Sequence, residues 1–182
     1  GGSDVKVLFA DKFSRSASGG VGFAKAAGNY AGQFYPTHLA QEQGYQQVVW
    51  TDADTHENLE EAGVMNVFFR VGDTLITAPT SDRILDGITR KSILEVAKDE
   101  GIKVEVRKVS VHEIEEAAKS GTLMEIFGTG TAAVVNPIAG FGSKGKDYDL
   151  PKLDNSYAMR LKKRITDIQT NKAEDKFGWR YK

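Results

Sequence analysis

The chain has 182 residues, a formal net charge of −1 and 27% charged residues, a composition typical of a soluble globular protein. Lysine and arginine are dispersed along the sequence, which excludes a basic surface for nucleic acid or an anionic membrane. Cysteine is absent, which excludes disulfides, thiolate metal sites and a cysteine nucleophile. The three histidines lack the spacing of metal ligands, so no metal site is predicted.

The length predicts one domain, over residues 5–182. Residues 1–4 (GGSD) lack a structural pattern and are interpreted as the stub of a linker or a cloning remnant. No apolar run approaches the ~20 residues needed to span a bilayer, and no secretory signal is visible. These features predict a cytoplasmic protein.

The N-terminal half is expected to contain mainly strands, over residues 5–10, 46–51, 64–70 and 74–78. The last two flank Gly72-Asp73, which indicates a short hairpin. Residues 14–22 are rich in Gly and Ser and predict a loop. Residues 30–43 look helical, although Pro36 should kink or divide that helix.

In the C-terminal half, helices are expected over residues 91–100, 111–119 and 155–170, and strands over residues 103–109, 123–127 and 132–138. Gly101 follows the first helix as a stop signal. Ser110 precedes the second, and Glu113 completes the pattern of a capping box. Because strands and helices alternate irregularly, the sequence predicts a mixed α/β domain.

Lys25 stands in a segment of small residues, Gly20-Val21-Gly22-Phe23-Ala24-Lys25-Ala26-Ala27-Gly28-Asn29-Tyr30. Small neighbours leave room for a flat ring, and Tyr30 offers a phenol nearby. An amine in a desolvated or electrostatically tuned site forms Schiff bases with carbonyl compounds. The alternatives are a solvated surface lysine and a turn before a helix capped by Asn29.

Glu61 precedes an Ala-Gly turn in Glu61-Ala62-Gly63-Val64-Met65-Asn66, just before an apolar strand. A carboxylate that faces a ring nitrogen can keep a proton on it. Because Glu57 and Glu60 make the segment acidic, a solvated loop is the alternative.

Two Gly/Thr segments are candidate phosphate sites. Gly87-Ile88-Thr89 precedes a helix, whose N-terminal N–H groups and dipole favour an anion, although Thr89 could also be a simple N-cap. Gly128-Thr129-Gly130-Thr131 offers a hydroxyl and a close backbone approach. It is not a Walker A loop, because the required lysine does not follow.

In this order the motifs resemble the C-terminal half of the branched-chain amino acid aminotransferases, fold-type IV enzymes that use pyridoxal 5'-phosphate. The resemblance runs from about residue 5 to residue 170. It implies the large domain of the D-amino acid aminotransferase-like fold, a mixed sheet or pseudo-barrel with flanking helices. It also implies a homodimer, and transamination of leucine, isoleucine and valine with 2-oxoglutarate.

The resemblance assigns a role to each motif. It implies that Lys25 forms the Schiff base with the cofactor and moves the substrate proton. Tyr30 would hydrogen-bond the phenolic oxygen of the cofactor, and Glu61 its pyridine nitrogen. Phosphate contacts would come from Ile88, Thr89 and Thr131. The backbone of Ala132 would bind the substrate carboxylate, and Asn66 would support the site from behind.

The sequence departs from the family pattern in three places. Val64 stands where many members have Thr, so a hydroxyl contact is lost. Residues 133–136 replace the Cys-x-x-Cys pair of some members, so no thiol switch operates. The N-terminal domain of the family, which supplies an arginine for the phosphate and much of the side-chain pocket, is absent.

The missing domain leads us to expect that the chain alone is inactive. Two alternatives follow from the same motifs. One is another fold-type IV enzyme, either a D-amino acid transaminase or an aminodeoxychorismate lyase. The other is a folded, non-catalytic domain.

Overall fold

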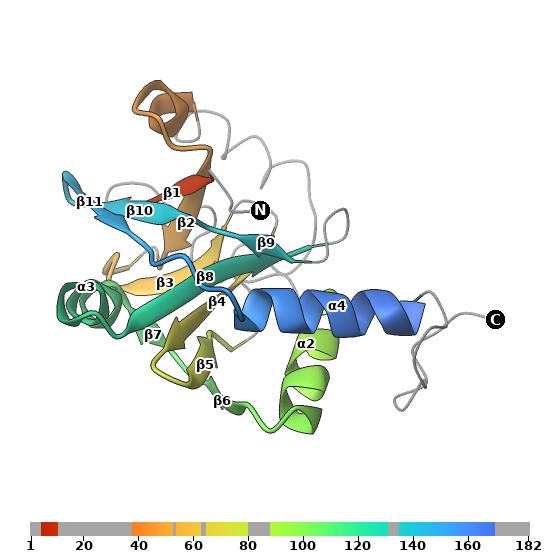
Figure 1. Ribbon diagram of the computed structural model, residues 1–182. Coiled ribbons are helices and arrows are strands. Elements are labelled where there is room, and N and C mark those ends of the chain that lie inside the picture. The colour runs from red at the N-terminus through yellow and green to blue at the C-terminus, as the bar shows by residue number, and fades with distance from the viewer. Residues whose placement is uncertain are drawn as a thin grey trace.

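The computed structural model describes residues 5–10, 38–52, 54–62, 65–79, 88–130 and 135–169. This part of the chain forms two mixed β-sheets and the helices α2, α3 and α4 (Figure 1). The mixed α/β class predicted from the sequence is therefore confirmed.

The first sheet, here called sheet A, has six strands in the order β11-β10-β1-β2-β3-β7. Their bounds are Lys6–Phe9 for β1, Gln47–Thr51 for β2, Asn58–Ala62 for β3, Val109–Ser110 for β7, Gly140–Ser143 for β10 and Lys146–Asp149 for β11. Strand β1 is parallel to both of its neighbours, and the other pairs are antiparallel.

The second sheet, sheet B, has five strands in the order β6-β5-β4-β8-β9. Their bounds are Asn66–Val71 for β4, Thr74–Thr77 for β5, Lys103–Val106 for β6, Leu123–Thr129 for β8 and Asn136–Pro137 for β9. The predicted hairpin is confirmed, since β4 and β5 pair antiparallel around a turn in which Gly72 has a φ of 60°.

The main core lies between the two sheets. It contains apolar side chains from sheet A, such as Val49 and Phe141, and from sheet B, such as Phe69 and Ile126. Helix α3 (Val111–Ser120) closes one end of this core with Ile114. The core joins the two sheets because each of them turns one apolar face inward.

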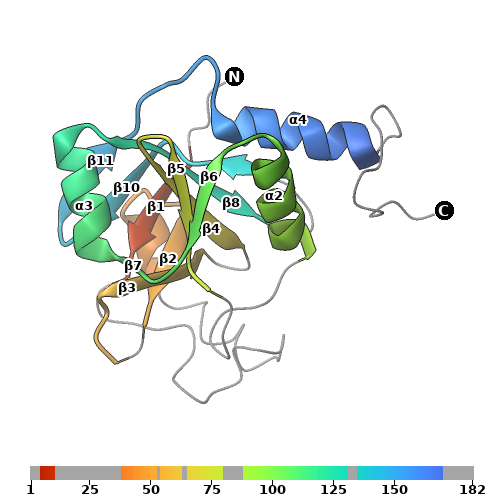
Figure 2. The same ribbon diagram turned by 90° about the horizontal axis from the view of Figure 1, so that it is seen from below.

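A second core covers the other face of sheet B. Here α2 (Ile88–Asp99) and α4 (Tyr157–Gln169) pack over Phe68 and Phe127, whose rings stack with centroids 5.3 Å apart. Figure 2 shows α2 and α4 together on one side of the molecule and α3 on the opposite side. Arg164 ties the two helices through Asp99, at 3.0 Å, and Glu100, at 3.2 Å.

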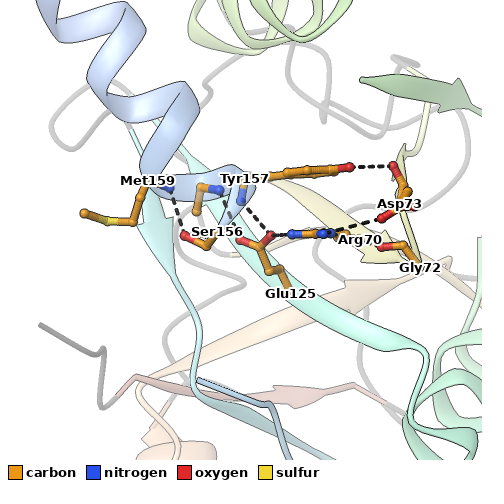
Figure 3. Close-up of polar contacts among 8 residues, drawn as sticks. Arg70, Gly72, Asp73, Glu125, Ser156, Tyr157 and Met159 are labelled. Atoms are coloured by element: carbon orange, nitrogen blue, oxygen red, sulfur yellow. Dashed lines mark hydrogen bonds and ion pairs between the residues drawn. The ribbon is translucent and has the colours of Figure 1, made fainter. Parts of the chain in front are cut away.

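The start of α4 is held by a buried carboxylate from the sheet. Glu125 of β8 accepts hydrogen bonds from the backbone N–H of Tyr157 at 2.8 Å and of Ala158 at 3.0 Å. It also receives Arg70 of β4 at 2.8 Å, and the Arg70 guanidinium lies 3.6 Å from the centre of the Tyr157 ring (Figure 3). Ser156 adds a cap by accepting from Met159 N–H at 3.1 Å.

The segment predicted as one strand over residues 103–109 is two strands in different sheets. Strand β6 pairs with β5 of sheet B, whereas β7 pairs with β3 of sheet A. Between them Arg107 donates to Glu105 and makes two hydrogen bonds to Glu113, at 2.8 and 2.6 Å. Its ion pairs hold the bend, so the single-strand prediction was wrong.

The capping box before α3 is half confirmed. Ser110 accepts from Glu113 N–H at 3.0 Å, as predicted, but the Glu113 carboxylate binds Arg107. Two other elements were not predicted. One is β3, which lies in the acidic segment interpreted as a solvated loop. The other is the β10–β11 hairpin, whose turn has positive φ at Lys144 and Gly145.

Most of the remaining predicted elements are found with small shifts. Of the strand predicted over residues 132–138, residues 136–137 form β9, and residues 132–134 lie outside the described part, as does the loop predicted over residues 14–22. Helix α2 begins at Ile88 rather than residue 91, so Ile88 and Thr89 are in its first turn. Strand β8 runs to Thr129, which places Gly128 and Thr129 in the strand rather than in a turn. Of the helix predicted over residues 30–43, residues 38–42 are helical and residues 30–37 lie outside the described part.

Candidate functional site

A ladder of side-chain pairs on the helix-covered face of sheet B leads to the candidate site. Strands β4 and β8 place Arg70 opposite Glu125, Phe68 opposite Phe127, and Asn66 opposite Thr129. Alternate residues of a strand share a face, so all three pairs face α2 and α4. The ladder begins with an ion pair, continues with the stacked rings and ends with a polar pair. This polar pair lies where β4 begins and β8 ends, and this end of the strands is called the edge of sheet B below.

That polar pair is buried. Asn66 is 8% exposed and Thr129 is fully buried. The Thr129 hydroxyl has no hydrogen-bond partner among the described residues. A buried polar group without a partner costs free energy, so such a group in a native protein points to a ligand or another partner. The end of β8 is therefore a candidate binding position.

The first turn of α2 lies at the same edge of sheet B. Arg90 of this turn is 6% exposed and donates to the carbonyl of Ala78 at 2.8 Å. Ala78 follows β5, and Thr77, the last residue of β5, lies opposite Phe68 near the start of β4. The hydrogen bond from Arg90 to Ala78 therefore holds the N-terminus of α2 near the Asn66–Thr129 pair.

This helix N-terminus has the charge of an anion site. Its first turn contains no acidic residue, while Arg90 and Lys91 add positive charge to the positive end of the helix dipole. The backbone N–H groups and the dipole at this end of the helix favour an anion.

Glu61 lies where the chain passes from sheet A to sheet B. Its backbone belongs to β3 of sheet A, and only residues 63–64 separate the end of β3 from Met65, which precedes β4. Glu61 and Asn66 therefore lie on either side of the short segment that connects sheet A to sheet B.

The loop before β3 is fixed by a buried aspartate. Asp52 accepts from the backbone N–H of Asn58 at 2.8 Å and of Glu57 at 3.1 Å, and from both the N–H and the hydroxyl of Thr55. Burial opposes ionisation of Asp52, but these hydrogen bonds outweigh it and lower its pKa to about 2. The loop therefore holds the start of β3 in place.

Half of the predicted site residues can be placed. Asn66 is described in full, and Glu61, Ile88 and Thr89 are described by their backbone. Lys25, Tyr30, Thr131 and Ala132 lie outside the described residues. Thr131 is two positions beyond Thr129 in the sequence.

The sequence interpretation missed Thr129 and Arg90 as members of this edge. Thr129 was included in a predicted turn, but its spacing of two from Phe127 and of four from Glu125 is the signal of a shared strand face. Arg90 directly follows the Gly87-Ile88-Thr89 segment, but the sequence does not distinguish a buried arginine in a first helical turn from a surface cation.

One hollow formed by the described residues lies elsewhere. It has a volume of about 670 Å³ and is lined by the first half of β8, the start of α4 and the segment between β11 and α4, including Met124, Met159 and Pro151. It is therefore at the Glu125 end of the ladder, away from Asn66 and Thr129. None of the described helices is both long enough and apolar enough to cross a membrane.

The chain is similar to known proteins over nearly its whole length. The family model of class IV amino-transferases (Amino-transferase class IV) matches residues 11–141. A probable branched-chain-amino-acid aminotransferase of Staphylococcus epidermidis is 40% identical over 177 residues, which are 97% of this chain and 49% of that protein. The chain thus spans about half the length of the curated relatives it matches.

Solved structures agree with the fold. The branched-chain amino acid aminotransferase from Escherichia coli superposes with a TM-score of 0.79 at 25% identity, covering 96% of this chain and 56% of that one. An aminotransferase from Brucella abortus bound to the co-factor PLP gives a TM-score of 0.73 at 23% identity, covering 88% and 53%. These neighbours share the mixed α/β architecture expected for fold-type IV enzymes. The chain belongs to the class IV amino-transferase family, and its relatives are named as branched-chain-amino-acid aminotransferases, which are transferases.

Proposed function

We propose that the chain is the cofactor-binding, C-terminal part of a branched-chain amino acid aminotransferase. The parent reaction moves the amino group of leucine, isoleucine or valine to 2-oxoglutarate, with pyridoxal 5'-phosphate as cofactor. The observation that carries this proposal is the convergence of Asn66, Thr129 and the first turn of α2 at one edge of sheet B. The relatives' names supply the substrate class.

The residues at this edge fit a phosphorylated pyridine aldehyde. The N-terminus of α2 suits a phosphate, and the buried hydroxyl of Thr129 offers a further polar group. The stacked Phe68 and Phe127 rings, which are buried under α2 and α4, support the polar pair from the core side.

The residues of this chain have distinct tasks in the proposal. With the cofactor bound, the amine of Lys25 would hold its aldehyde carbon and would move a proton to or from the substrate Cα. The carboxylate of Glu61 would keep a proton on the ring nitrogen, and the phenol of Tyr30 would orient the ring. Pyridoxal phosphate, when bound, withdraws electrons from the substrate carbon.

The remaining residues bind and orient. Backbone N–H groups at Ile88 and Thr89 and the hydroxyl of Thr131 hold the phosphate. The backbone of Ala132 binds the substrate carboxylate. Asn66, buried behind the edge, supports the site from the sheet side.

Reduction with borohydride tests the proposal, because it fixes the cofactor covalently to the lysine that holds it. The purified chain is incubated with pyridoxal phosphate, reduced and mapped by mass spectrometry. We expect the adduct on Lys25 and none in Lys25→Arg, which keeps the charge but cannot form the bond. Lys98→Arg, at the other end of α2, is the matched control and should label normally. An adduct on a different lysine would contradict the assignment.

A further inference from the structure

Met65 lies between two glycines at the end of β8 and an asparagine of β9. A Cβ added to Gly128 would be 3.2 Å from both Sδ and Cε of Met65, and one added to Gly130 would be 3.1 Å from its Cγ. The thioether therefore occupies the space that side chains at these positions would fill. A side chain at either position would require Met65 to shift by a few tenths of an ångström.

The sulfur is held from a third side. Asn136 donates from its Nδ2 to Met65 Sδ at 3.1 Å, and Asn136 is the register partner of Gly128 across the β8–β9 pair. Thioethers are weak acceptors, but this contact also fixes the rotamer of a flexible side chain. Met65 thus touches the end of β8 and is anchored by the next strand.

The two faces of β8 are therefore held by different means at this end. Thr129 is buried on the face toward α2 and α4, opposite Asn66. Met65 covers the other face at Gly128 and Gly130, and it directly precedes Asn66 in the chain. Because neither glycine has a side chain to lock its own backbone, contact with Met65 restricts the path of the strand end.

We infer that Met65 is a positioning residue for phosphate binding, an inference that rests on the proposed function. By packing on Gly128 and Gly130, Met65 fixes the end of β8, where the buried Thr129 hydroxyl lies. It acts through the backbone of Gly130 and does not itself contact the cofactor. Loss of the contact should impair recognition of the phosphate more than recognition of the aldehyde ring.

The test compares two probes, pyridoxal 5'-phosphate and pyridoxal, which lacks the phosphate. Each is titrated by visible absorbance into the wild-type chain and into Met65→Ala, Met65→Leu, Gly130→Ala and the double variant Met65→Ala/Gly130→Ala. Met159→Ala, at a methionine that is 52% exposed, is the matched control. Thermal unfolding without ligand reports on folding independently.

We expect Met65→Ala to weaken pyridoxal phosphate binding about tenfold, the effect of losing one hydrogen bond to a charged group, with pyridoxal affinity changed by less than about twofold. Met65→Leu keeps the volume but loses the sulfur acceptor, and should fall between wild type and Met65→Ala. Gly130→Ala should also weaken phosphate recognition. The double variant should recover part of that loss, because Met65→Ala removes the Cγ that the new methyl group would meet.

Three outcomes would overturn the inference. One is equal weakening of both probes in Met65→Ala, which indicates a general structural role. Another is a Gly130→Ala defect that Met65→Ala does not relieve. The third is a wild-type chain that binds pyridoxal phosphate no better than pyridoxal, which would overturn the proposed function together with the inference. In the first two outcomes wild type still discriminates, so the proposed function would stand.

Discussion

Two acidic residues near β3, Asp52 and Glu61, have different roles in this account. Asp52 is buried and accepts several hydrogen bonds from the loop before β3. Glu61, near the end of β3 itself, stands at the crossing between the sheets. The first carboxylate stabilises the fold, and the second is assigned to chemistry in the proposal. Each leads to a separate prediction.

Asp52→Asn should destabilise the protein at neutral pH. The folded pKa of about 2 is below the ordinary value of 3.8, so ionised Asp52 stabilises the native state above pH 3.8. That contribution is lost as the pH falls through about 2. The shift corresponds to about 2 kcal/mol in the free energy of unfolding. In the Asp52→Asn variant, an amide nitrogen would also face the donors of Thr55.

The measurement is urea unfolding of both proteins from pH 7 to pH 2. The difference between wild type and Asp52→Asn should be largest near neutral pH and shrink as the pH falls from about 4 to 2. Asp149→Asn is the control, because the Asp149 side chain is 85% exposed and pairs with Lys6 only at 3.9 Å. A difference that stays constant with pH would show that Asp52 is not held ionised by these hydrogen bonds.

Glu61→Gln should slow catalysis in the full-length parent far more than it weakens cofactor binding. Glutamine keeps the shape but removes the charge that favours a protonated ring nitrogen. Loss of one well-placed electrostatic interaction lowers kcat by roughly 10²–10³, by analogy with oxyanion-hole deletions. Glu57→Gln and Glu60→Gln are the matched controls from the same segment. Near-native turnover of Glu61→Gln would assign the role to one of those neighbours.

At the level of elements, the docking of α4 depends on one ion pair inside sheet B. The Arg70 and Glu125 side chains are 13% and 8% exposed, and Glu125 also caps two N–H groups of α4. Figure 3 shows the carboxylate between the guanidinium and the helix N-terminus. The helix dipole favours a negative charge there, so the Glu125 carboxylate stabilises both the buried Arg70 guanidinium and the N-terminus of α4.

Glu125→Gln should therefore cost about 3 kcal/mol, the lower end of the range for breaking a buried pair, because Arg70 keeps its ion pair with Asp73 at 3.6 Å. The near-UV circular dichroism signal, to which the packed Tyr157 ring contributes, should also decrease as α4 loosens. The control is Glu116→Gln on α3, where the partner Lys119 lies 3.5 Å away and both side chains are at least half exposed. We expect less than about 1 kcal/mol there. A Glu125→Gln protein as stable as the control would refute this account of α4.

The elements that the sequence predicted well are those with local signals. Strand β2, the β4–β5 hairpin and α4 follow from periodicity and turn residues. The division of residues 103–109 between two sheets could not be predicted, because it depends on Arg107 reaching Glu113 of α3 and on β7 finding β3. Strand β3 was missed because its acidic residues resemble a solvated loop. Pairing between distant strands overrode local preference in both cases.

Some residues of the candidate site could be predicted from the sequence, and others could not. The family motifs identified Asn66, Ile88 and Thr89, which the structure places at one edge of sheet B by side chain or backbone. Thr129 was not identified, because its burial opposite Asn66 arises from the β4–β8 register. Met65 was part of a motif, but its contact with Gly128 and Gly130 requires coordinates.

At the scale of the whole molecule, the chain covers about half of its curated relatives. In the proposal, the other half supplies an arginine for the phosphate and one wall of the substrate pocket. Holding substrate and cofactor in a defined orientation can account for about 7–11 kcal/mol of barrier reduction. An open half-site also lets water surround the charged groups and weakens their electrostatic effect. We therefore predict that the chain alone binds cofactor weakly and does not transaminate.

The assay follows glutamate formation from leucine and 2-oxoglutarate, first with the purified chain and then after adding a separately produced N-terminal half. No glutamate above background is expected from the chain alone, and activity should rise when the halves are mixed. D-alanine in place of leucine tests the related D-amino acid transaminase activity. The Lys25→Arg chain with the same N-terminal half is the control and should stay inactive. Robust turnover by the chain alone would refute the half-site argument, because it would show that these 182 residues already position both substrate and cofactor.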